Sequence, residues 1–142
     1  MKEEQIVERF KQGIDCSQIV FEHAANAIGF DRDKALKIAA GFGGGMWAGR
    51  TCGCVCGAIM ALGLKYGHCK DGDMEQKNVL LAKKADFEQQ FKACHGSLVC
   101  KEILGYDLSK PEDMQQIMEK NLLLTVCPKC VKTACEILDK SL

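Results

Sequence analysis

The chain has 142 residues, with 19 basic and 19 acidic side chains, so its formal net charge is zero. A chain of this length buries roughly two-thirds of the surface that it exposes when unfolded, so it needs no disulfides to fold around a core. Its neutral charge argues against a dedicated nucleic-acid binder, because such proteins need a basic surface. The outstanding feature is ten cysteines. We expect one domain, covering residues 1–142.

The compartment predicted from the sequence is the cytoplasm. Residues 1–5 (MKEEQ) are polar and contain no apolar segment of the kind found in a secretory signal. Disulfides are rare in the cytoplasm, where cysteines more often serve as metal ligands, catalytic thiols or small buried residues. No membrane span is expected, because the least charged stretch, residues 38–64, is rich in glycine and contains Arg50.

Apolar residues recur with a helical period and do not alternate, which predicts an all-α fold. We expect a compact bundle of about six to eight helices with a glycine-rich loop. Residues 41–50 (GFGGGMWAGR) form that loop, since each glycine inside a helix costs about 1 kcal/mol relative to alanine. Before the loop, helices are expected over residues 3–12, over 17–28 with Ala27 on the inner face, and from a cap at Asp31 or Asp33 to about residue 40.

After the loop, a helix is expected over residues 53–66. Its Gly53, Gly57 and Ala61 form a stripe of small residues that allows another backbone to approach closely. Residues 122–126 are too short an apolar run to assign. The remaining expected helices begin at a capping box formed by Asp73 and Gln76, at a Ser97 cap, at a capping box over residues 109–112 (SKPE) that includes a proline, and at Pro128.

Several familiar cysteine sites are excluded by spacing. Residues 127–130 form a CxxC that is followed by Val131, so it is not a c-type haem attachment site. The paired CxxC pattern of zinc sites and the compact ferredoxin spacings are absent. The glycine loop lacks a phosphate-binding pattern, and no hydrolase signature is present. The cysteines therefore have to be judged by their positions along the predicted helices.

Four cysteines are predicted at or near helix starts, namely Cys16, Cys52, Cys100 and Cys127. Unpaired amides and the positive end of the helix dipole stabilise a thiolate there. Thiolate is the form of cysteine that binds metals or attacks a disulfide. These four positions are the candidate functional residues, whereas Cys69, Cys94 and Cys135 are most simply small buried residues.

Four short cysteine-containing motifs follow one another along the chain. They are residues 13–16 (GIDC), residues 52–57 (CGCVCG), residues 100–105 (CKEILG) and Cys127. In this order they resemble the C-GCAxxG-C-C family of redox-active proteins over nearly the whole chain, with Cys54 in place of the alanine of the family's CGAxxG signature. The resemblance implies four characteristic cysteines, which are again Cys16, Cys52, Cys100 and Cys127. A related domain in split-Soret cytochromes resembles an iron–sulfur carrier.

The first hypothesis is a redox protein, an electron carrier or oxidoreductase, in which these four cysteines bind an iron–sulfur cluster, [2Fe-2S] in the simplest case. Cys54, Cys56 and Cys130 are alternative ligands. The glycine loop would bring backbone amides close to the sulfurs, and Met46 and Trp47 would shield the site from water. A redox partner protein is expected, and a homodimer is compatible with the sequence.

Two alternatives stay open. A metal-free thiol–disulfide protein would use Cys52 as nucleophile, with Cys54, Cys56 or Cys100 as the resolving partner. A soft-metal protein would bind zinc or copper through the CxCxC run together with the cysteines of the last helix, Cys127, Cys130 and Cys135. Of the histidines beside cysteines, His68 and His95 are more simply loop or helix-end residues than ligands.

Overall fold

The computed structural model describes residues 1–142 and confirms the all-α prediction, since helices form nearly all the regular structure and no strand is present. Two short turns, η1 (Ala40–Phe42) and η2 (Gly45–Gly49), occupy the predicted glycine loop. The helices are α1 (Glu3–Lys11), α2 (Cys16–Ile28), α3 (Arg32–Ala39), α4 (Gly53–Tyr66), α5 (Met74–His95), α6 (Cys100–Leu104), α7 (Pro111–Glu119), α8 (Leu122–Thr125) and α9 (Cys127–Ser141).

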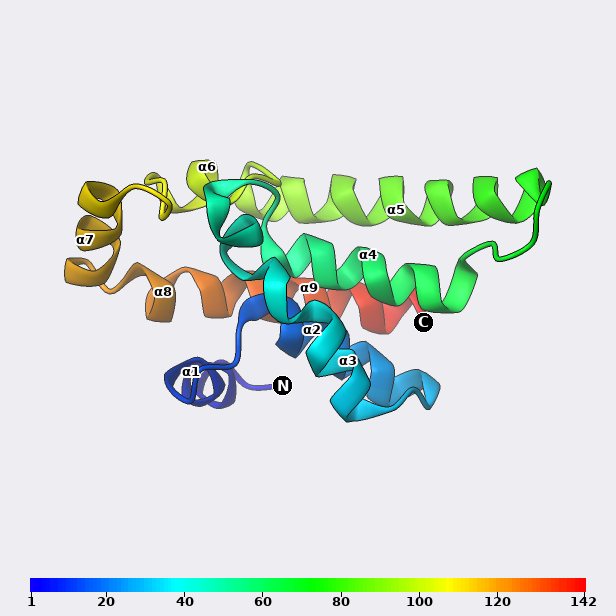
Figure 1. Ribbon diagram of the computed structural model, residues 1–142, viewed down its shortest axis with the longest axis horizontal. Helices are drawn as coiled ribbons and strands as arrows, with labels where there is room; N and C mark the ends of the chain where they lie inside the picture. The colour runs from blue at the N-terminus through cyan, green and yellow to red at the C-terminus, as the bar shows by residue number, and fades with distance from the viewer.

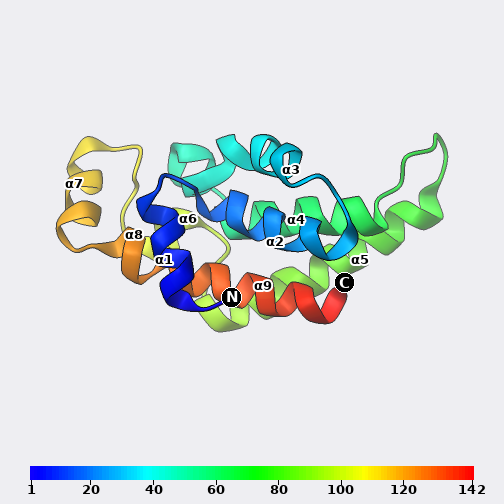
Figure 2. The ribbon, with the colours of Figure 1, turned by 90° about the horizontal axis from the view of Figure 1, so that it is seen from below.

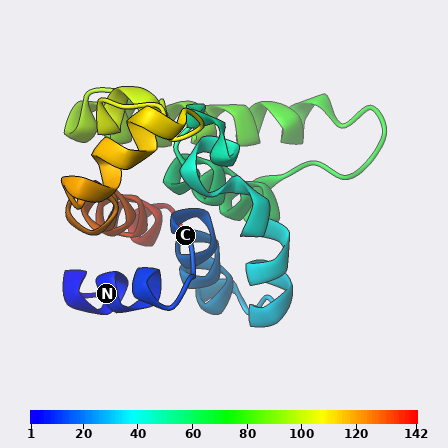
Figure 3. The ribbon, with the colours of Figure 1, turned by 60° about the vertical axis from the view of Figure 1, so that its left-hand side comes forward.

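The long helices lie side by side, and three of them start at the same end of the bundle. Helices α2, α4 and α9 run in the same general direction, and α5 runs back against α4 and α9 (Figures 1 and 2). The short helices α6, α7 and α8 gather at the end where α9 begins, and Figure 3 shows α7 and α8, in yellow and orange, in front of this end. Several helix starts are thereby brought to one region of the bundle.

The packing of α2 on α4 is the most extensive contact between helices. The predicted stripe of small residues explains it, because a Cβ added to Gly57 would lie 2.5 Å from the carbonyl oxygen of Ser17. The Ser17 hydroxyl in turn donates to the carbonyl of Ala39 over 2.8 Å, which joins α2 to the end of α3. The glycines of α4 therefore set the distance between the two central helices.

One buried charge ties the first three helices together. Glu22, whose side chain is 9% exposed, accepts hydrogen bonds from Arg9 of α1 over 2.7 Å and from Arg32 of α3 over 2.9 Å. Burial opposes ionisation of Glu22, but the two guanidinium groups outweigh it and lower the pKa of the carboxyl. The carboxylate therefore stays charged and paired inside the bundle.

The helix starts confirm some of the predicted caps and contradict others. Asp31 and Asp73 accept the backbone N–H of the third helical residue of α3 and α5, over 2.8 and 3.0 Å. Ser97 does not cap α6: its hydroxyl accepts from the N–H of Val99, which is itself the N-cap. The Ser109 prediction is also wrong, because Ser109 bonds back to Asp107 and α7 starts one residue later.

Burial departs from the predicted pattern at a few other positions. Ala27 is exposed, while Phe21 and Ala25 of the same helix are buried, so the inner face of α2 is rotated relative to the expected one. Most of the segment 122–126, left unassigned from the sequence, forms the single turn α8, which ends at Thr125. Among the helices, none combines the length and apolar character that crossing a membrane requires.

Candidate thiol site

The four cysteines predicted at helix starts are found there. Cys16, Cys100 and Cys127 are the first residues of α2, α6 and α9, and Cys52 is the residue immediately before α4. The amides of a first helical turn have no partner within the helix, and the aligned peptide dipoles add positive charge. Four separate helices thus each present one thiol from the end that favours a negative charge.

A short backbone pairing places Cys52 beside Cys100. Thr51 and Val99 form an antiparallel bridge between the end of the glycine loop and the segment before α6. The N–H of Cys52 donates to the carbonyl of Leu98 over 2.7 Å, and the N–H of Cys100 donates to the carbonyl of Arg50 over 2.6 Å. Two helix starts that are 48 residues apart in the sequence are held together by these bonds.

A glycine brings Cys16 to the same place. A Cβ added to Gly53 would overlap the Sγ of Cys16 and would lie 2.9 Å from the carbonyl oxygen of Phe42. The missing side chain therefore leaves the space that the Cys16 sulfur occupies. Because Gly53 is the first residue of α4, the starts of α2 and α4 meet at this thiol.

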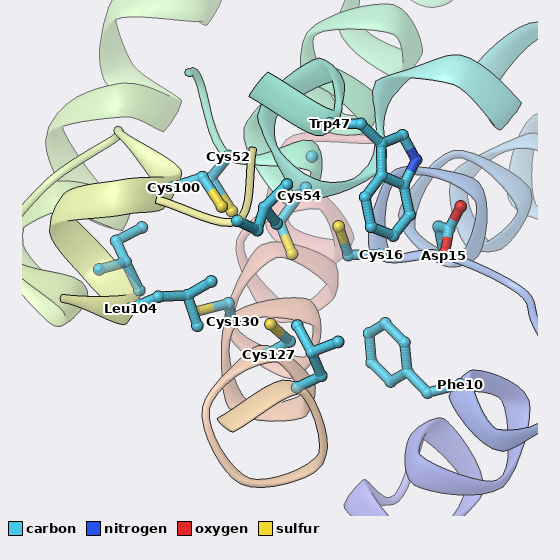
Figure 4. A pocket seen from close by; sticks show the side chains of 15 residues that line it. Phe10, Asp15, Cys16, Trp47, Cys52, Cys54, Cys100, Leu104, Cys127 and Cys130 are labelled. Atoms are coloured by element: carbon cyan, nitrogen blue, oxygen red, sulfur yellow. The ribbon is translucent and has the colours of Figure 1, made fainter. Parts of the chain in front are cut away.

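The thiols surround one cavity of about 60 Å³. In Figure 4 the labelled cysteines surround a common space, with Trp47, Asp15 and Phe10 on one side and Leu104 on the other. Apart from the cysteines the lining is almost entirely apolar, and Asp15 is its only charged residue. The cysteines that line the cavity are Cys16, Cys52, Cys54, Cys100, Cys127 and Cys130.

Two of these cysteines extend the predicted set of four. Cys54, in the first turn of α4, is fully buried, and Cys130, in the first turn of α9, is 2% exposed. The sequence named both as alternatives to the four, and the structure brings both to the same cavity. All ten cysteines are free thiols.

Cys52 has neighbours that favour ionisation of its thiol. Hydrogen bonds from the thiols of Cys130 and Cys54 lower the pKa of Cys52 well below its ordinary value. The backbone amides of Cys54 and Val55 also lower the pKa of Cys52. The Cys52 side chain nevertheless forms no capping hydrogen bond of normal geometry with α4. Burial raises the pKa of Cys54, and of Cys100 to about 12, so these neighbours stay protonated.

The remaining cysteines lie outside the cavity. The Cys56 thiol faces the carbonyl of Thr51 at 3.7 Å, and burial raises its pKa to about 11. Cys135 is buried, as predicted, whereas Cys69 and Cys94 are exposed, which contradicts their assignment as small buried residues. Cys94 lies in α5, and this helix buries only Phe87 and Phe91.

A histidine contacts the outer side of the thiol group. The Nδ1 atom of His95, at the end of α5, lies 3.7 Å from the Sγ of Cys130, and its Nε2 lies 2.9 Å from the hydroxyl of Thr133. Burial lowers the pKa of His95, which favours the neutral ring. The helix-end position agrees with the sequence, but the contact with Cys130 was not foreseen, since the two residues are 35 positions apart.

The glycine loop forms part of the cavity wall in an unusual backbone conformation. Gly44, Gly45, Met46 and Trp47 all have positive φ, from 50° to 63°, in the left-handed region. A residue other than glycine costs roughly 1–2 kcal/mol in that region. Trp47 lines the cavity as expected and is 45% exposed, whereas Met46 is 43% exposed and does not line it.

One family model matches most of the chain. The family described as "Putative redox-active protein (C_GCAxxG_C_C)" matches residues 14–141. The chain belongs to this family. The match includes all ten cysteines and begins after α1, so every thiol of the chain lies within the part that matches the C_GCAxxG_C_C family. Neither the curated proteins nor the solved structures contain a significant match to the chain.

Within this C_GCAxxG_C_C chain, no group of three or more His, Cys, Asp and Glu side chains has the arrangement that would hold a metal ion. The proposed cluster and the zinc alternative both stay predictions. The donor set itself suits iron–sulfur chemistry, since thiolates are the ligands of such clusters and these thiols come from four helix starts.

Sequence reasoning missed the apolar part of the cavity wall. Phe10 lies in α1, ahead of the family match, and no pattern in the sequence connected it with the cysteines. Leu104, Leu108 and Leu123 come from the short helices and loops of the end region. Only Asp15, which directly precedes Cys16, carried a signal in the sequence, through its position as the N-cap of α2.

Proposed function

We propose that this redox-active family member holds an iron–sulfur cluster, in the simplest case [2Fe-2S], on Cys16, Cys52, Cys100 and Cys127, and passes electrons to a partner protein in the cytoplasm. The observation that carries the proposal is the gathering of these four thiols, one from each of four helix starts, around one buried cavity. When bound, such a cluster supplies one-electron redox chemistry.

The residues around the thiols suit that role. The four helix starts offer positive potential to bound thiolates, which offsets part of the cost of burying negative charge. Phe10, Leu104 and Leu108 make the surroundings of the sulfurs apolar. Burial and hydrogen bonds to sulfur are the levers by which a protein sets the potential of a thiolate-held cluster.

Iron and sulfide analysis of anaerobically prepared protein tests the proposal. We expect about two irons and two sulfides per chain for a [2Fe-2S] cluster, with visible absorption that bleaches on reduction. Protein that stays colourless and retains no iron after chemical reconstitution would refute the proposal.

A second candidate function is metal-free thiol–disulfide exchange. It is favoured by the contact between the Cys52 thiolate and the protonated Cys130, which belong to different helices and make a nucleophile and resolving pair. Cys54 and Cys100 stay alternative resolving thiols, since both line the cavity, whereas Cys56 faces away from it.

Thiol counting under metal-free conditions tests the second candidate. Oxidation by a glutathione buffer is expected to remove two titratable thiols, and peptide mapping is expected to find a disulfide between Cys52 and Cys130. The Cys130→Ala variant is expected to lose that disulfide. If the number of free thiols does not change between reducing and oxidising buffers, thiol exchange is rejected.

A further inference from the structure

A second, outer cleft adjoins the thiol cavity. It has a volume of about 290 Å³, near the lower end of the range of about 300–1,000 Å³ that is typical of small-molecule sites. Phe10, Asp15, Trp47 and Leu123 line both spaces, so a single layer of side chains separates the outer cleft from the thiols. A compound bound in the cleft would therefore lie next to the redox site.

The cleft contains a half-exposed tryptophan, Trp47, whose backbone is held in a strained conformation. Trp47 and its neighbour Met46 both have left-handed backbone angles, with φ of 50° and 59°. Strain of this kind persists only where the surrounding structure imposes it, and it is concentrated at binding sites. Phe10 also lines the cleft and supplies a second aromatic ring. Figure 4 shows the rings of Trp47 and Phe10 on the same side of the neighbouring thiol cavity.

The cleft has one basic residue, Lys11, and one acidic residue, Asp15, in its lining. Lys11 lines the cleft and forms no ion pair or side-chain hydrogen bond with the rest of the chain. Asp15 lies at the wall shared with the thiol cavity and forms no ion pair either. The rest of the lining is mainly apolar and includes Ile117 and Met118. An unpaired ammonium favours an anionic ligand group, and a carboxylate can accept from an N–H.

We propose that the outer cleft binds a flat, conjugated heteroaromatic compound with an anionic tail, which is the chemistry of flavin mononucleotide. The ring lies against Trp47 and Phe10, a ring N–H donates to Asp15, and the anionic tail pairs with Lys11. The inference goes beyond the proposed function, because this binding requires neither a cluster nor a disulfide.

Fluorescence titration of the reduced protein tests the proposal with flavin mononucleotide as the probe. Trp47 is the chain's only tryptophan, so its emission reports directly on the cleft. We expect saturable quenching. Riboflavin, which has the same ring and no phosphate, is expected to bind about fivefold more weakly. High salt should remove that difference, since it screens an exposed ion pair.

Two variants and a matched control test the Lys11 contact with the phosphate separately from the Trp47 contact with the ring. Lys11→Met is expected to weaken binding of the phosphorylated flavin about fivefold and to leave riboflavin unchanged. Trp47→Leu, followed by flavin emission, is expected to weaken both ligands about twofold to tenfold. Lys37→Met, which removes an exposed lysine of α3 away from the cleft, should change neither.

The proposal is overturned if quenching does not saturate, or if Lys11→Met leaves the affinity for the phosphorylated flavin unchanged. Because riboflavin binding controls for the folding of the Lys11→Met variant, that comparison decides the matter even if Trp47→Leu proves unstable. Iron content is measured on the same samples. Loss of the cluster with intact flavin binding would contradict only the proposed function, and the reverse result only this inference.

Discussion

Replacing Cys52 with serine is expected to remove most of the bound iron, whereas replacing Cys56 with serine is expected to leave it in place. Cys52 lines the thiol cavity, and hydrogen bonds from Cys130 and Cys54 lower the pKa of its thiol. Cys56 lies one turn further along the same helix and faces the carbonyl of Thr51. Iron and sulfide per chain, measured after anaerobic reconstitution, give the comparison.

The Cys56→Ser variant is a matched control, because it makes the same chemical change in the same helix. Unfolding by urea is measured in parallel to show that both variants are folded. Equal loss of iron from the Cys52→Ser and Cys56→Ser variants would contradict the assignment. Cys54→Ala, which restores the alanine of the family signature, is expected to keep the cluster if the ligands are the four cysteines at helix starts.

Replacing Gly57 or Gly53 with alanine is expected to destabilise the fold by about 1–3 kcal/mol each, the usual cost of inserting a methyl group into a packed core. The Gly57 Cβ would lie 2.5 Å from the backbone carbonyl of Ser17, which cannot rotate away. The Gly53 Cβ would displace the Cys16 thiol, so Gly53→Ala should also lose iron. Urea unfolding gives the change in the free energy of unfolding.

Gly63→Ala supplies the control for the glycine substitutions. Gly63 lies in the same helix, and a Cβ added there would meet nothing within 4 Å. The substitution is therefore expected to be neutral or to stabilise the chain by up to about 1 kcal/mol through helix propensity. If Gly57→Ala were as stable as Gly63→Ala, close approach of α2 and α4 would not explain the glycine stripe.

The sequence predicted two of the helix caps correctly, because each cap lies within one short segment. The Asp31 and Asp73 caps were predicted because a side chain and an amide three residues later form a self-contained unit. Ser97 and Ser109 carry the same signal, yet neither caps its helix. The Ser97 hydroxyl accepts from the N–H of Val99, whereas the hydroxyl and N–H of Ser109 both donate to the carboxylate of Asp107. A serine next to a loop thus finds other partners close by in the sequence.

The thiol site was only half visible in the sequence. The positions of Cys16, Cys52, Cys100 and Cys127 at helix starts followed from local periodicity and agreed with the family pattern. That Cys130 joins them and Cys56 does not depends on which way each residue of a helix turn faces. A prediction of helix ends that is uncertain by about 2–4 residues cannot determine that direction.

The sequence by itself determined the helical fold class, the glycine loop and the four cysteines at helix starts, because these depend on residue type and spacing within short segments. Only the tertiary structure decided which thiols share a cavity. The pairing of Thr51 with Val99 and the space left by Gly53 act between distant parts of the chain. Such contacts form when helices pack, and their geometry is fixed by the partner surface rather than by either segment alone.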